Sequence, residues 1–141
     1  MADLKFVATI CWAGTDCAGL GLLIRWLAAG RPRRQSALIT AFPAVCVVAH
    51  PALALAGLAA WVAFLVTGAA GLAWCAFATL AVSAMLGFVL LTRWLGGRGG
   101  RHARLPRQRF PASLVALHGV VGLSAFGLTL MAATLAGQTG R

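Results

Sequence analysis

A hydrophobic pattern that occurs twice constrains this chain more than any other feature. The tripeptide RWL at 25–27 recurs at 93–95, and the segment FPAVCVVAH at 42–50 recurs as FPASLVALH at 110–118. Matched positions lie 68 residues apart in both motifs, so no net insertion separates the two copies. A constant offset of this kind indicates a duplicated structural unit.

Composition and hydropathy indicate a membrane protein. Hydrophobic residues make up 61% of the 141 residues, and only two residues are acidic, whereas soluble domains are about 45–50% apolar. Four long stretches are almost free of Lys and Arg, and each exceeds the about 20 residues that a spanning helix needs. They predict spans at about 6–28, 37–66, 71–95 and 110–136. The expected fold is all-α, with one integral membrane four-helix bundle over residues 1–141.

The two repeats are expected at about 6–68 and about 74–136. Each contains two spans, so the repeats run parallel and their pseudo-twofold axis lies along the membrane normal. That symmetry brings the two histidines that end the repeated segment, His50 and His118, to one depth in the membrane.

Basic residues predict the orientation. Ten of the twelve Lys and Arg residues fall in two clusters: Arg25, Arg31, Arg33 and Arg34, and then Arg93, Arg98, Arg101, Arg104, Arg107 and Arg109. Basic connections stay cytoplasmic, so the loops at about 29–36 and 96–109 should be cytoplasmic and both termini outside (N-out/C-out) in a bacterial plasma membrane. We expect these arginines to contact anionic lipid of the bilayer or, for Arg25 and Arg93, haem propionates. Their confinement to two connections argues against a nucleic-acid partner.

Each repeat carries one histidine within a predicted span. His50 follows Pro43 by seven residues, and His118 follows Pro111 by seven; proline suits the first turn of a helix. Each imidazole then lies about 10 Å from the start of its helix. Polar groups at that depth are costly and usually functional, and two opposed histidines can be the axial ligands of haem iron. One histidine per helix predicts one haem b, near the cytoplasmic side.

Small residues follow both histidines by one and two helical turns. They are Ala54 and Gly57 after His50, and Gly122 and Ala125 after His118. Such a strip leaves room for a flat macrocycle, which makes these positions candidate cofactor contacts, but it also allows close approach of two helices. Both interpretations stay open, as does a third in which the histidines only form hydrogen bonds between helices.

Asp16 has no acidic counterpart, because Ala84 occupies the matching position of the second repeat. A carboxylate at this depth requires a partner or a proton. Asp16 is a candidate acceptor that orients a ring N–H of either histidine, and a protonated acid in a cavity is the alternative. Cys46 lies one turn before His50, so Cys46, His50 and Asp16 form an alternative site for copper or zinc.

The segments HPALALAGLAAWVAFLVTG, from His50, and LHGVVGLSAFGLTLMAATLAG, from Leu117, resemble the ligating helices of small b-type membrane cytochromes. They are also similar to uncharacterised four-helix membrane proteins of high-GC bacteria. The resemblance covers about a third of the chain and implies haem ligation by His50 and His118. Cytochromes with two haems carry a second histidine on each ligating helix, which this chain lacks.

These observations favour a membrane protein that binds one haem b for electron exchange or redox sensing, with a membrane redox partner or as a homodimer. No serine with a plausible base, carboxylate pair or glycine-rich phosphate loop is recognisable, so an electron carrier or binding subunit is expected rather than an enzyme. The alternatives are a non-catalytic membrane subunit or scaffold without a cofactor, and a small metal-handling or transport protein.

Overall fold

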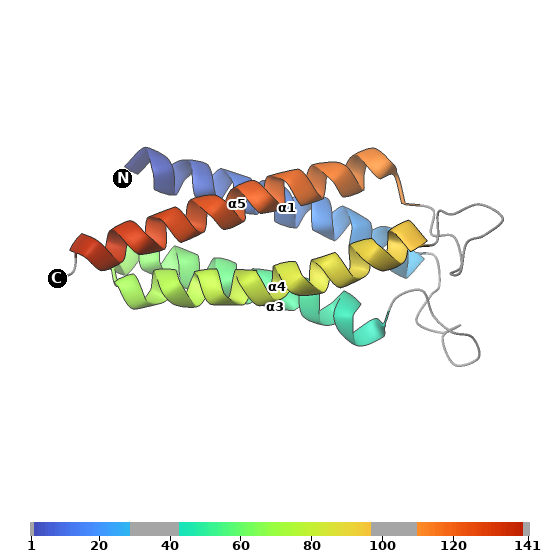
Figure 1. Ribbon diagram of the computed structural model, residues 1–141, viewed down its shortest axis with the longest axis horizontal. Coiled ribbons are helices and arrows are strands. Elements are labelled where there is room, and N and C mark those ends of the chain that lie inside the picture. Colours follow the sequence, from blue (N-terminus) through green and yellow to red (C-terminus); the bar gives the residue numbers. More distant parts are fainter. Residues whose placement is uncertain (1, 29–42, 97–109, 140–141) are drawn as a thin grey trace.

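The computed structural model describes residues 2–28, 43–96 and 110–139, and these form four long helices (Figure 1). They are α1 (Ala2–Ala28), α3 (Ala44–Thr67), α4 (Ala70–Gly96) and α5 (Ala112–Thr139). The helices contain 24 to 28 residues, which corresponds to about 36–42 Å and exceeds the about 30 Å hydrocarbon core of a bilayer. All four are apolar enough to cross a membrane. The prediction of an all-α, multi-pass helical bundle is therefore confirmed.

The four helices pack as two layers. Helix α1 packs most extensively on α5, and α3 on α4 (Figure 1). Helices α1 and α4 run in one direction, and α3 and α5 run in the opposite direction. Contacts between the layers are made by α4 with α5 and, less extensively, by α1 with α3.

Glycine makes the tight turn between α3 and α4. Gly68 has a φ of 73°, in the left-handed region, where a residue without a Cβ carries no steric cost. Its N–H donates to the carbonyl oxygen of Phe64 at 2.8 Å, which satisfies a carbonyl of the last turn of α3. Helix α4 then starts at Ala70, close to the expected start of the third span.

Two prolines affect the second span differently. Pro43 has an extended conformation and precedes the first residue of α3, Ala44. The prediction of one helix from 37 was therefore wrong at Pro43, and residues 37–42 lie outside the described part of the chain. Pro51 lies inside α3, which continues through it to Thr67. Pro51 lacks an N–H, so the carbonyl of Val47 loses its usual intrahelical donor.

The interior of the bundle contains two separate hydrophobic clusters. The turn-side cluster consists of Ala8, Trp12, Trp61, Phe64, Ala73, Ala76, Leu80, Ala125, Ala132, Ala133 and Ala136. The arginine-side cluster, at the end where α1 and α4 terminate, consists of Trp26, Val47 and Trp94. In the turn-side cluster the rings of Trp12 and Trp61 stack with centroids 6.1 Å apart. The indole N–H of Trp61 donates to Thr9 Oγ1 at 2.9 Å.

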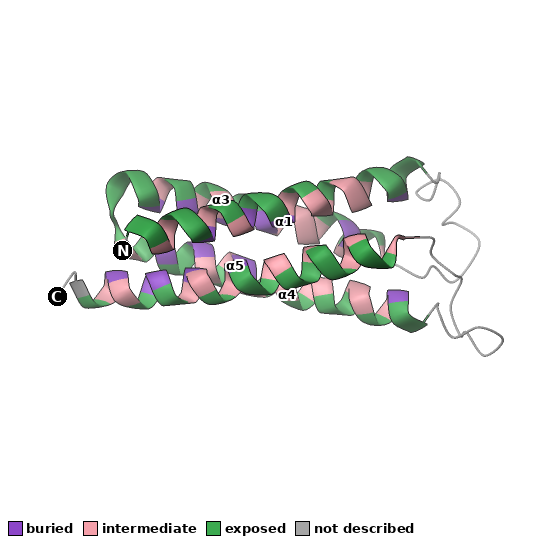
Figure 2. Cartoon of the chain, turned by 90° about the horizontal axis from the view of Figure 1, so that it is seen from above, coloured by how far each residue is buried: buried purple, intermediate pink, exposed green. Residues whose placement is uncertain are grey.

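Large apolar side chains also cover the outside of the bundle. Figure 2 shows buried positions on the inward faces of the helices and exposed positions on the outward faces. The exposed side chains include Phe6, Val45, Val66 and Met85. A surface of this kind is unfavourable in water and suits contact with lipid, so the bundle contacts the bilayer directly.

Candidate functional site

The structure brings together the two histidines that the repeated motif singled out. His50 comes from α3 and His118 from α5, so each layer supplies one ring. The ring centroids lie 5.8 Å apart and the ring planes are nearly perpendicular, at 83°. Both residues are partly buried and belong to neither hydrophobic cluster.

A backbone carbonyl of the same layer binds each ring. His118 Nδ1 lies 3.0 Å from the carbonyl oxygen of Thr15 in α1, and His50 Nδ1 lies 2.8 Å from that of Ser83 in α4. A carbonyl only accepts hydrogen bonds, so each Nδ1 must be protonated and donate. In a neutral imidazole the other nitrogen, Nε2, then carries a lone pair. Both rings are thus held in the tautomer that ligates a metal through Nε2.

Ser83 makes further contacts with His50. Its hydroxyl donates to the carbonyl oxygen of His50 at 2.9 Å and lies 3.1 Å from His50 Nδ1. The corresponding residue in the first repeat, Thr15, does not do the same for His118: Thr15 Oγ1 is buried without a hydrogen-bond partner. The two histidines are consequently held by the same type of carbonyl bond, but His50 has the additional hydroxyl.

Two glycines allow the rings to lie directly against the helices. A Cβ on Gly19 would lie 3.0 Å from His118 Cε1, and a Cβ on Gly87 would lie 3.0 Å from His50 Cε1. Gly19 is one turn after Thr15, and Gly87 is one turn after Ser83, so carbonyl and glycine share a helix face. The two pairs are 68 residues apart, like the histidines. The pattern Ser/Thr-x-x-x-Gly at this offset is present in the sequence, but residue types alone do not indicate that it binds histidine.

The strip of small residues is filled by protein side chains. A Cβ on Gly57 would lie 2.6 Å from Thr79 Oγ1 and 3.0 Å from Trp12 Cζ2, while one on Gly122 would lie 3.6 Å from Thr15. Ala125 belongs to the turn-side cluster, and Ala54 is buried. These four positions fall on the core-facing stripe of their helices, so they permit close helix packing.

Asp16 makes no hydrogen bond to either ring, unlike the role that we expected for it. Asp16 Oδ2 is buried and has no hydrogen-bond partner, and the Thr15 carbonyl binds His118 instead. The carboxylate of Asp16 therefore orients neither ring.

The alternative metal site does not form either. Among residues 2–28, 43–96 and 110–139, no three His, Cys, Asp or Glu side chains come together as metal ligands. Cys46, His50 and Asp16 all belong to these ranges. Cys46 is a free, partly buried cysteine of α3.

Arg25 and Arg93 lie in the last turns of α1 and α4. Each follows its glycine, Gly19 or Gly87, by six residues, which corresponds to about 9 Å along the helix. Arg25 is exposed and Arg93 is partly buried. Two guanidinium groups are thus available at one end of the bundle, at corresponding positions relative to the histidine pair.

No protein-family model, curated protein or solved structure matches this chain.

Proposed function

We propose that this membrane protein binds one b-type haem through His50 and His118 and uses it for electron exchange or redox sensing with a membrane partner. One observation carries the proposal: the Nδ1 atoms of both imidazoles are within hydrogen-bond distance of backbone carbonyls. Both rings therefore present Nε2 lone pairs, one from each layer, with ring centres 5.8 Å apart.

The residues present would suit a metal ion held by histidine nitrogens. His50 and His118 would supply two imidazoles whose ring centres lie 5.8 Å apart, a spacing compatible with metal–nitrogen bonds of about 2.0–2.1 Å. A hydrogen bond from Nδ1–H to a carbonyl is also the usual outer-shell support of a ligating histidine.

Several residues of the chain would hold the group. The carbonyls of Thr15 and Ser83 orient the rings and increase the electron density at Nε2. Gly19 and Gly87 keep space for the rings against α1 and α4. Arg25 and Arg93, about 9 Å further along, suit carboxylate side groups of the porphyrin. A bound haem would supply one-electron chemistry that no side chain of the site provides.

Internal duplication and orientation belong to the same proposal. The support for duplication is that both histidine–carbonyl bonds and both histidine–glycine contacts join positions with the same offset of 68. Each histidine is bound by the first helix of the other repeat, as expected for two halves related by an axis along the bundle. The arginine-rich connections favour an N-out/C-out topology in a bacterial plasma membrane. A reporter fused within 97–109 should then be cytoplasmic.

A structural membrane subunit is the second candidate. Its support is that each ring already binds a neighbouring helix and that Gly57 and Gly122 are closely packed. In this function the histidines would only stabilise helix pairs, and the protein would carry no haem.

A reduced-minus-oxidised visible spectrum of the purified protein, expressed with a haem supply, separates these functions. We expect a sharp b-type α band that is absent in His50→Ala and in His118→Ala. His102→Ala is the matched control, because His102 belongs to the arginine-rich connection and should leave the band unchanged. A featureless spectrum from folded protein would reject the haem and favour the structural subunit.

A further inference from the structure

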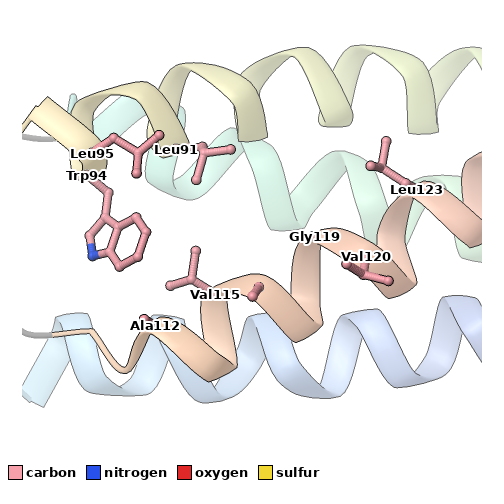
Figure 3. A pocket seen from close by; sticks show the side chains of 9 residues that line it. Leu91, Trp94, Leu95, Ala112, Val115, Gly119, Val120 and Leu123 are labelled. Atoms are coloured by element: carbon pink, nitrogen blue, oxygen red, sulfur yellow. The ribbon is translucent and has the colours of Figure 1, made fainter.

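A cavity of about 450 Å³ lies between α4 and α5 and is lined by neither His50 nor His118 (Figure 3). We call it the α4–α5 groove. Its lining residues are Leu91, Trp94, Leu95, Ala112, Val115, Ala116, Gly119, Val120 and Leu123. Every lining side chain is apolar except for the indole nitrogen of Trp94. The groove is therefore unsuited to a polar metabolite.

The groove opens on the surface that faces lipid. Among its lining residues Leu95 is 52% exposed, Val120 65% and Leu123 58%. Gly119 has open space at its Cβ position, so the missing side chain deepens the groove. An apolar hollow on this surface is accessible from the hydrocarbon phase.

The shape of the groove indicates a chain-like occupant. Its α5 wall extends from Ala112 to Leu123, which is about 16 Å at about 1.5 Å per residue. That length is close to half of the about 30 Å hydrocarbon core. One extended acyl chain from a single leaflet matches it.

Positive charge gathers where the groove begins. Arg93 lies in the last turn of α4, and α5 begins at Ala112, so the positive end of the α5 dipole also lies at this end. Basic sites between membrane helices attract anionic headgroups.

We propose that the α4–α5 groove binds one acyl chain of an anionic phospholipid, with the headgroup phosphate at the end of the groove beside Arg93 and the start of α5. The apolar groove contains neither proposed haem ligand, but its headgroup end uses Arg93, which the proposed haem site also uses. The proposal places an anionic phospholipid on the face of the bundle that α4 and α5 form.

Native mass spectrometry of the detergent-purified protein tests the site. Phosphatidylglycerol and phosphatidylcholine with identical acyl chains are added in equal amounts, and the retained lipid is counted. Gly119→Leu fills the groove. Gly127→Leu is its matched control, since Gly127 is also exposed on α5 with open space at its Cβ position but does not line the groove. Arg93→Gln removes one charge from the headgroup end.

We expect the wild type and Gly127→Leu to retain one phosphatidylglycerol and Gly119→Leu to lose it. Arg93→Gln should reduce the preference for phosphatidylglycerol about fivefold, as expected for one arginine near a headgroup. Equal retention of both lipids by the wild type, or full retention by Gly119→Leu, would overturn the proposal. It would also be overturned if Gly119→Leu removed a haem absorption band while lipid stayed bound, because the groove would then belong to the macrocycle.

Discussion

The imidazole rings of His50 and His118 lie 5.8 Å apart, one contributed by each layer of the bundle. Each ring is bound within its own layer by a carbonyl of the neighbouring helix. The spacing of the rings therefore depends on how the layers meet, while the orientation of each ring depends on its own helix pair.

Replacing Gly87 by Ala should displace His50, because the new methyl group would lie 3.0 Å from His50 Cε1. Gly19→Ala should affect His118 in the same way. We expect both variants to remain helical but to lose or broaden the haem α band. Gly71→Ala, also in α4 but with open space around its Cβ position, is the control. Unchanged spectra in both variants would mean that the rings do not need these glycines.

Removing the Ser83 hydroxyl should lower stability without removing haem. Ser83→Ala loses the bond to the carbonyl oxygen of His50, which is worth about 1 kcal/mol, but it keeps the backbone carbonyl that holds Nδ1. Thr15→Val is the matched variant, since Thr15 Oγ1 is buried without a partner and its loss should not destabilise the protein. Thermal unfolding in detergent compares the two, and equal losses of stability would contradict the asymmetry.

Asp16→Asn should keep haem binding and should not destabilise the bundle. The carboxylate makes no hydrogen bond to either histidine, and its buried Oδ2 has no partner. An uncharged amide is cheaper to bury than an unpaired carboxylate. The measurements are the reduced-minus-oxidised spectrum and the unfolding temperature, with exposed Asp3→Asn as the control. Loss of haem in Asp16→Asn alone would restore the role that its sequence position suggested.

Gly57→Ala should destabilise the bundle by about 1–3 kcal/mol, as overpacking of a tight contact does. The added Cβ would lie 2.6 Å from Thr79 Oγ1 and 3.0 Å from Trp12 Cζ2. Gly127→Ala, at an exposed position of α5 with open space, should have little effect. If Gly57→Ala weakened haem binding and left the stability unchanged, the residue would border the cofactor instead of packing helices.

Much of the fold could be predicted because it depends on local hydropathy. The spans that end near Ala28, Thr67 and Gly96 followed from runs of apolar residues bounded by Gly and Arg. The start of the second span was less predictable. Hydropathy continues across Pro43, but the extended backbone of this residue makes α3 begin at Ala44.

Of the candidate site, only the pair of histidines could be predicted from the sequence. His50 and His118 are separated by the same 68 residues as the rest of the repeat. Symmetry between the two repeats was therefore enough to predict that the two side chains lie close together. The packing of Gly57 against Trp12 could not be expected, because it depends on which helices become neighbours. In a four-helix bundle, a small residue on the inward face can border a cavity or a large side chain of another helix. The sequence of its own helix does not indicate which of the two lies opposite.

By itself, the sequence determined the four apolar helices, the offset of 68 and the identity of the two central side chains. These properties depend on composition and spacing along the chain. Only the tertiary structure decided that the carbonyls of Thr15 and Ser83, instead of the carboxylate of Asp16, hold the imidazoles. The physical reason is that every residue has a carbonyl, so residue type gives no signal for such a bond. Its acceptor is selected only when α1 packs on α5 and α4 packs on α3.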